Sequence, residues 1–250
     1  MYIIPANFGN DSVALIQWAH QRQLNTVSVI YIETGWAAPE WPARVQHCQQ
    51  WVETLGFNNI TLQPKADFVS LMRQRGSFPS RKFQWCAGFL KGLPLLAWLD
   101  QDEIDPGAEA TIMLAHRRSA SPTLFDLPEY IEESAHYGER LVWHPLWQHT
   151  NKHMLSLVKQ ANMPILNHRS LECDPCVNSD LADFLRMAPQ TLQKAAELET
   201  EITGKLLDPS IYKDQPNLAK ARHGYLQTDS RTPSADLFSM GCGSPFGCGL

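Results

Sequence analysis

The chain has 250 residues, of which 44% are hydrophobic and 19% are charged, and its formal net charge at pH 7 is −5. This composition supports one large domain, or a domain with a small appendage, and its bulk charge gives no support to nucleic-acid binding. Its apolar stretches are shorter than the ~20 residues of a membrane span, and residues 1–10 lack a secretion-signal pattern, so we expect a cytoplasmic protein with no membrane partner.

Short apolar runs and helical patterns alternate along the first two thirds of the chain. Strands are expected over residues 2–5, 26–32, 60–62, 111–114 and 141–143. Helices are expected over residues 11–23, 42–55, 67–74, 88–100 and 151–160. This alternation predicts an α/β fold with a doubly wound, mostly parallel sheet covered by helices on both faces.

The C-terminal part of the chain has a different character. Residues 180–203 follow a helical pattern, whereas residues 204–250 are rich in Pro, Gly and Ser and end in GCGSPFGCGL. We therefore expect one domain over residues 1–170 and a helical, loop-rich extension that contains cysteines over residues 171–250. A tail of this composition needs an anchor, and its two cysteines offer one.

A glycine-bearing turn joins the first expected strand to the first expected helix. In this turn, Gly9 allows close approach of the backbone to a phosphate, Asn10 and Ser12 can donate hydrogen bonds, and Asp11 can hold Mg²⁺ or cap the helix. An ordinary capped turn is the alternative. A second such turn, Glu33-Thr34-Gly35-Trp36, follows the next strand, at the sheet edge where open α/β folds bind ligands.

Taken in order, these segments resemble the PP-loop family of ATP pyrophosphatases, and within it the phosphoadenosine phosphosulfate (PAPS) reductase-like branch. The resemblance covers about residues 2–180. The matching segments are FGNDS at 8–12, ETGW at 33–36, RKFQWC at 81–86 with Lys91 and Pro94, AHRRSAS at 115–121, WHPLW at 143–147 with Thr150, and CDPC at 173–176. The fold that this implies is the adenine nucleotide alpha-hydrolase-like one.

The resemblance implies roles for individual residues. Those expected to bind the nucleotide are Asn7, Phe8, Gly9, Asn10, Ser12, Glu33, Thr34, Gly35 and Arg118. Those expected to be catalytic are Asp11, Lys91, Arg117 and Cys248. The guanidinium groups of Arg117 and Arg118 suit bidentate phosphate binding, although a solvated surface pair is the alternative.

Several positions depart from the family pattern. Asn7 stands where the family usually has serine, Asn10 where it often has lysine, and Gln84 where an arginine precedes Trp-Cys. Ala115 and Ala120 replace the glycine and glutamate of the arginine loop. These departures affect the expected rate or substrate more than the fold.

The chain has six cysteines. Because disulfides are rare in the cytosol, clustered cysteines there more often indicate metal binding or redox chemistry. Cys48 lies in a helical apolar pattern and is expected in the core. The spacing of Cys173 and Cys176 fits zinc, an iron–sulfur cluster or dithiol redox chemistry. Resemblance to the adenylyl-sulfate reductases implies a [4Fe–4S] cluster on Cys86, Cys173 and Cys176, and the tail supplies a fourth ligand. We assign Cys242 to the cluster and Cys248 to a nucleophilic or persulfide role; structural zinc is the alternative.

Two enzyme functions share these features. In the first, Mg²⁺-ATP adenylates an acceptor, pyrophosphate leaves and sulfur is inserted; in the second, a terminal cysteine attacks adenylyl-sulfate or phosphoadenylyl-sulfate and sulfite leaves. The Asp11-Ser12 pair and the incomplete terminal reductase motif favour the first. The expected partners are an adenine nucleotide, a sulfur donor protein or thiol reductant, and a nucleobase or nucleic-acid acceptor; a homodimer stays open. A non-catalytic nucleotide-binding scaffold with structural zinc is a third reading.

Overall fold

The computed structural model describes residues 1–101, 110–121 and 124–207. A single six-stranded sheet runs through this part of the chain in the order β3-β2-β1-β4-β6-β5. Every pair of neighbouring strands is parallel except β5 and β6, which are antiparallel. The strands are β1 (Tyr2–Pro5), β2 (Val27–Ile32), β3 (Asn58–Leu62), β4 (Thr111–Met113), β5 (Tyr130–Ser134) and β6 (Arg140–Trp143).

The sheet buries apolar side chains on both of its faces. All six residues of β2 are buried, as expected of a central parallel strand covered on both sides. Side chains alternate along it, so that Val29 packs in a cluster on one face and Ile30 in a cluster on the other. The β-branched runs of the sequence therefore form the predicted doubly covered sheet.

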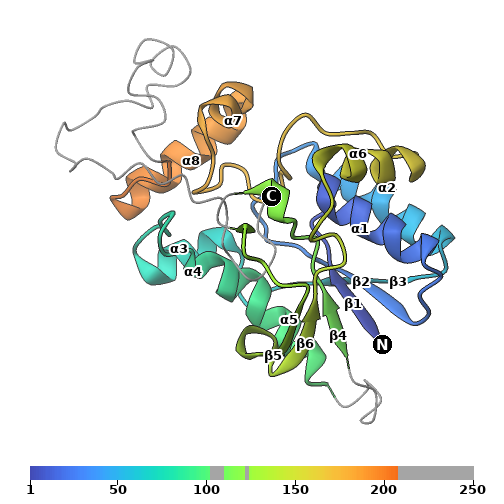
Figure 1. Cartoon of the computed structure of the whole chain (residues 1–250). Helices are drawn as coiled ribbons and strands as arrows, with labels where there is room; N and C mark the ends of the chain where they lie inside the picture. Colours follow the sequence, from blue (N-terminus) through green and yellow to red (C-terminus); the bar gives the residue numbers. More distant parts are fainter. Residues whose placement is uncertain (102–109, 122–123, 208–250) are drawn as a thin grey trace.

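Three helices cover the first of these faces, and Figure 1 shows them side by side. They are α1 (Asn10–Gln21), α2 (Trp41–Thr54) and α6 (Asn151–Gln160). The opposite face is covered by α5 (Leu93–Leu99), whose Leu95 and Leu99 pack on Ile3, Ile30 and Ile112. The chain moves to this face between β3 and β4, so strand order reverses between β1 and β4, where open α/β sheets form their ligand crevice.

A continuous helical stretch precedes β4. It consists of α4 (Trp85–Ala87), a π-helical segment η1 (Gly88–Gly92) and α5. The predicted helix over 88–100 is therefore confirmed in its place, but its first turn is wider than an α-helix. Lys91 lies within this π segment and its side chain is buried.

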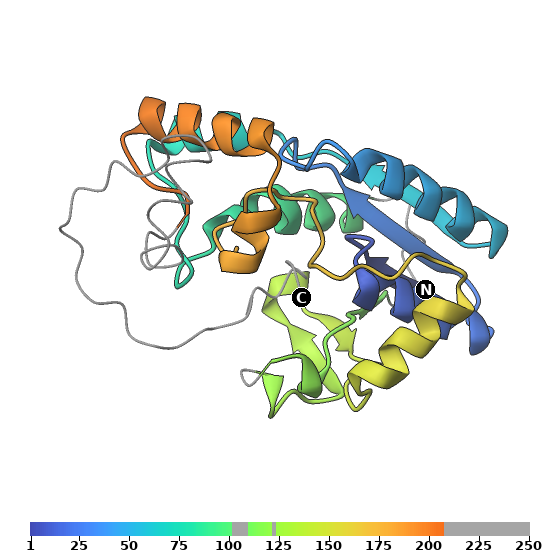
Figure 2. The same ribbon diagram turned by 90° about the horizontal axis from the view of Figure 1, so that it is seen from above.

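Of the two helices after residue 180, the second lies beside α3 (Phe68–Arg75), as Figures 1 and 2 both show. Both helices contribute to a separate apolar cluster that includes Trp36, Phe68 and Phe184. The helical pattern predicted over 180–203 is confirmed, and it is divided between two helices, α7 (Leu181–Arg186) and α8 (Pro189–Ile202). The physical reason is Pro189, which fixes the first turn of a new helix and disfavours helical geometry in the residue before it.

Strand β5 was not predicted. Four of its five residues are exposed and, among the described strands, it pairs only with β6, so its sequence lacks the apolar alternation of a half-buried strand. Two 3-10 turns, η2 (Arg118–Ala120) and η4 (Ala135–Tyr137), lie in the loops before and after it. Among the described helices, none is both long and apolar enough to cross a membrane.

Candidate functional site

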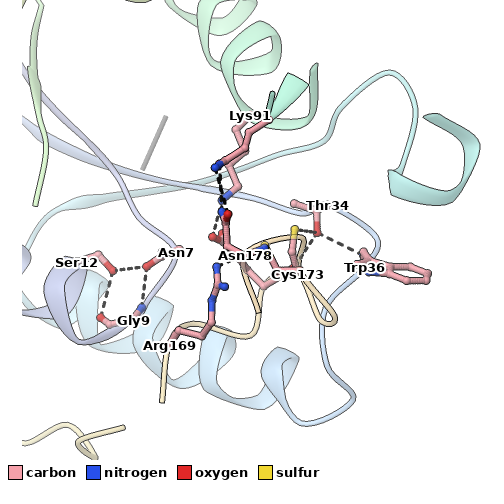
Figure 3. Close-up of polar contacts among 12 residues, drawn as sticks. Asn7, Gly9, Ser12, Thr34, Trp36, Lys91, Arg169, Cys173 and Asn178 are labelled. Carbon is pink, nitrogen blue, oxygen red and sulfur yellow. Dashed lines mark hydrogen bonds and ion pairs between the residues drawn. The ribbon is translucent and has the colours of Figure 1, made fainter. Parts of the chain in front are cut away.

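The loop between β1 and α1 brings backbone and side-chain polar groups to the N-terminus of α1. The Asn7 side-chain oxygen accepts hydrogen bonds from the Gly9 N–H (2.9 Å) and from the Ser12 hydroxyl (3.0 Å), as Figure 3 shows. Gly9 is the N-cap of α1 and has no side chain with which to cap it. An oxygen acceptor therefore already occupies the end of α1, where the helix dipole favours negative charge.

Distant parts of the chain hold this loop in place. Asn10 exchanges two hydrogen bonds with the backbone of Leu166 (2.8 and 3.0 Å), and Arg44 donates to the Phe8 carbonyl (2.7 Å). Phe8 is fully buried, with a φ of 55°, and its ring stacks on Tyr31 at 5.7 Å. Asn10 and Phe8 thus fix the loop, while Asn7, Gly9 and Ser12 form its inner hydrogen-bond ring.

The loop after β4 meets the phosphate loop through an ion pair. Arg117 Nε lies 2.5 Å from Asp11 Oδ1, and the arginine side chain is only 3% exposed. The same guanidinium also donates to Ser119 and Asn151, both at 2.9 Å. Arg118 points elsewhere: it donates to the Leu127 carbonyl (2.8 Å) and stacks 4.1 Å above the Trp147 ring.

The second predicted ligand loop lies beside the CDPC segment. Thr34 is fully buried and its hydroxyl donates to the Glu172 carbonyl (2.7 Å). Glu33 accepts from the Gly35 N–H (3.0 Å), and Gly35 has a φ of +70°, which favours glycine. A β-carbon at Gly35 would lie 2.7 Å from that of Asp67, so this turn leaves no room for a side chain.

A buried Lys91–Glu172 ion pair separates two neighbouring cavities. One cavity, with about 320 Å³ of empty space, is lined by the ends of β1 and β2 and by Asn7. The other, with about 510 Å³, is lined by the CDPC segment and by the residues around Cys86. Lys91 and Glu172 line both cavities, so the phosphate loop and the cysteines belong to adjoining spaces.

Cys86, Cys173 and Cys176 line the larger cavity together. The Cys173 thiol lies 3.5 Å from the Thr34 hydroxyl, and the Cys176 sulfur accepts from the Arg169 guanidinium (3.4 Å) and the Asn178 backbone N–H (3.5 Å). Within residues 1–101, 110–121 and 124–207, no three Cys, His, Asp or Glu side chains are gathered as a metal centre would require. Cys242 and Cys248 lie outside the described residues.

Burial dominates the electrostatics around the cysteine cavity. It raises the pKa of the Cys173 thiol well above its usual range and raises that of Asp174 to about 6. It also lowers the pKa of Lys194, whose ammonium lies 3.7 Å from the centre of the Trp36 ring.

Sequence reasoning missed four residues of this region: Arg44, Arg169, Ser170 and Glu172. No short motif contains Arg44, which reaches the loop from α2. The other three directly precede Cys173, so proximity to the CDPC segment was the one signal that could have drawn attention to them.

Residues 1–169 match the family model described as the phosphoadenosine phosphosulfate reductase domain. No curated protein matches the chain. Among solved structures, the phosphoadenylyl-sulfate (PAPS) reductase of Candida auris in its phosphate complex is 15% identical, with a TM-score of 0.45, and the match covers 66% of this chain and 74% of that one. The NMN synthetase of Francisella tularensis is 10% identical, with a TM-score of 0.48 and coverage of 94% and 89%.

Proposed function

Because the chain belongs to the phosphoadenosine phosphosulfate reductase domain family, we propose that it is an enzyme that binds an adenine nucleotide and uses it in sulfur chemistry. The phosphates would bind at the loop between β1 and α1, next to Gly9 and Ser12. The observation that carries this proposal is the shared wall between two cavities, in which Lys91 and Glu172 face both the phosphate loop and the three cysteines.

The reaction we propose is ATP-dependent adenylation followed by sulfur insertion. An acceptor oxygen attacks the α-phosphorus of ATP, the bond to the β-phosphate breaks, and pyrophosphate leaves. A sulfur nucleophile then attacks the activated carbon, whose bond to the adenylated oxygen breaks, and AMP leaves. Lys91, the N-terminus of α1 and Arg117 are the positive groups that would stabilise the charge that develops on the phosphates.

Two features support ATP as the nucleotide. Asp11 directly precedes Ser12 in the phosphate loop, and its carboxylate lies at the crevice between β1 and β4. A carboxylate in this place can share Mg²⁺ with the phosphates of ATP, since oxygen ligands suit this ion. Arg117 would then exchange part of its contact with Asp11 for contact with a phosphate.

We propose that a thiolate-bound centre lies at the larger cavity, because three cysteines line it. Cys86, Cys173 and Cys176 would be three ligands of a [4Fe–4S] cluster, and Cys242 would be the fourth; zinc on the same thiolates is the alternative. When bound, such a cluster would supply electrons or a binding position for sulfur. The chain's own contribution is to keep these thiols in one cavity beside Lys91.

Phosphoadenylyl-sulfate or adenylyl-sulfate reduction is the second candidate, and the family to which residues 1–169 belong favours it. Here the Cys248 thiolate would attack the sulfur of the substrate, and the adenine nucleotide would be released from the resulting cysteine S-sulfonate. A thiol reductant would then attack the cysteine sulfur, form a disulfide with it and release sulfite.

One assay separates these candidates. Purified protein prepared without oxygen is incubated with Mg²⁺-ATP and, separately, with phosphoadenylyl-sulfate plus a thiol, and pyrophosphate and sulfite are both measured. Pyrophosphate without sulfite supports adenylation, whereas sulfite that is lost in Cys248→Ser supports reduction. Neither product, with tight ATP binding, would overturn both in favour of a scaffold that only binds nucleotide.

A further inference from the structure

Ser170 is a buried polar side chain that the proposed reaction does not yet use. Its residue is 2% exposed, and none of the described residues provides a hydrogen-bond partner for its hydroxyl. Buried hydroxyls are normally paired, because an unpaired one loses its hydrogen bonds to water without replacement. An orphaned hydroxyl at the wall of a cavity therefore points to a ligand.

The position of Ser170 connects the two halves of the site. Its β-carbon is 3.4 Å from where a β-carbon on Gly9 would lie, so its side chain lies against the phosphate loop. It also lines the larger cavity together with Cys173 and Cys176. A group bound to this hydroxyl would touch the phosphate loop on one side and face the cysteines on the other.

The backbone that follows Ser170 fixes this placement. Ala38 N–H donates to the Leu171 carbonyl (2.9 Å) and Asp174 N–H to the Trp36 carbonyl (2.8 Å), so the segment after Ser170 pairs with the loop after β2. Trp36 and Cys173 also form a parallel bridge. Ser170 is thus held by backbone pairing that is independent of its own side chain.

Positive charge surrounds the same space. Arg169 lines the larger cavity, reaches the Cys176 sulfur at 3.4 Å and lies between the phosphate loop and Cys173 in Figure 3. Lys91 enters from the opposite side and is paired with Glu172. Two cations against one carboxylate leave a net positive wall, which favours an anion.

We propose that Ser170 and Arg169 form a subsite for a tetrahedral oxyanion, a sulfuryl or phosphoryl group, between the phosphate loop and Cys176. This inference rests on the proposed function, and it deepens it by naming where the charged group of the substrate lies relative to the cysteines. A hydroxyl donor and a guanidinium fork together match the oxygens of such a group. Both residues lie outside every motif that indicated the nucleotide site.

The test measures equilibrium binding of inorganic sulfate and of inorganic phosphate, by dialysis with radiolabelled anions, and binding of Mg²⁺-ATP by calorimetry. Ser170→Ala and Arg169→Gln should each weaken anion binding by about tenfold, because each removes a hydrogen bond to a charged group. Affinity for ATP should change less than twofold. Ser134→Ala, which removes another buried serine at the far edge of the sheet, is the matched control and should bind like the wild type.

The two anions distinguish the source of the group. Tighter binding of sulfate supports the subsite and assigns it to a sulfuryl group, and tighter binding of phosphate supports it and assigns it to a phosphoryl group other than those of ATP. The proposal is overturned if wild-type protein binds neither anion or if both variants bind the anions normally. It is also overturned if Ser170→Ala loses affinity for ATP and for the anions equally, because Ser170 would then only support Gly9. Failure of wild-type protein to bind ATP, with anion binding intact, would instead count against the proposed function alone.

Discussion

Asp11 and the buried Arg117 form a part-buried ion pair across the point where the strand order of the sheet reverses, with 2.5 Å between Arg117 Nε and Asp11 Oδ1. Asp11 comes from the first turn of α1, which follows β1, and Arg117 comes from the loop after β4. Strands β1 and β4 are adjacent and parallel. The pair therefore fixes the two walls of the crevice relative to each other. It also gives the crevice both an acidic and a basic group at the place where nucleotide phosphates would bind.

Removal of one partner of this pair should destabilise the protein. We expect Asp11→Asn to lower the free energy of unfolding by about 3 kcal/mol, because it leaves the Arg117 charge buried without its carboxylate. Urea unfolding at pH 7 measures this. Glu201→Gln breaks the exposed Arg73–Glu201 pair and serves as the control, with no measurable change expected. Equal stability of Asp11→Asn and wild type would contradict a structural role for the pair.

Lys91 and Glu172 should be energetically coupled. Both side chains are buried in the wall between the two cavities, so each single substitution by Met leaves an uncompensated charge, while the double substitution leaves none. A double-mutant cycle on unfolding free energy should give a coupling of about 1–3 kcal/mol. Strictly additive effects of the two substitutions would show that the ion pair contributes nothing to stability.

Gly35 and Gly56 offer a matched pair of glycines with left-handed backbone. Their φ angles are +70° and +76°, but a β-carbon would meet Asp67 at 2.7 Å in the first case and nothing within 4 Å in the second. Gly56→Ala should cost about 1 kcal/mol from backbone strain, and Gly35→Ala roughly 1–3 kcal/mol more from overpacking. Thermal unfolding of both variants tests this, and equal losses would argue against close contact between Gly35 and Asp67.

Acid should destabilise the protein through His116. Burial, and secondarily the neighbouring His144, lowers the pKa of His116 to about 4 from an ordinary value of 6.5. A lowered folded-state pKa means that the unfolded chain binds the proton first as pH falls. The associated stability is therefore fully present above about pH 6.5 and is lost as pH falls towards 4, with a total of about 3 kcal/mol.

Unfolding free energies measured between about pH 7 and pH 4.5 should thus fall less steeply in His116→Gln than in wild type. His47 is exposed on α2, so His47→Gln is the control and should keep the wild-type slope. Parallel pH profiles for wild type and His116→Gln would show that His116 does not carry this dependence.

The sequence predicted the sheet well because its central strands are buried on both faces. Burial on both faces leaves a run of apolar, often β-branched residues, as over 27–32, that few other structures produce. Strand β5 lacked this signal because four of its five residues are exposed. The break between α7 and α8 was not apparent because the helical spacing of apolar residues continues across Pro189.

The positions of individual residues of the candidate site were predictable where a local turn determines them. Gly9 and Gly35 could be recognised because glycine-bearing turns that follow adjacent strands indicate the sheet edge where open α/β folds bind ligands. Arg44, Arg169 and Ser170 could not, because their roles arise from contacts over long sequence separations, such as the one between Arg44 and Phe8. The assignments of Cys242 and Cys248 remain predictions.

The phosphate loop at Gly9 is the centre of the proposed nucleotide site, and one binding measurement tests it directly. Calorimetric titration of Mg²⁺-ATP into wild-type protein should show saturable binding with one nucleotide per chain. Gly9→Val should weaken it at least about 100-fold, because its side chain would crowd Asn7 and Ser170 and block the backbone from the phosphates. Unchanged ATP affinity in folded Gly9→Val protein, or no binding to the wild type, would contradict the account.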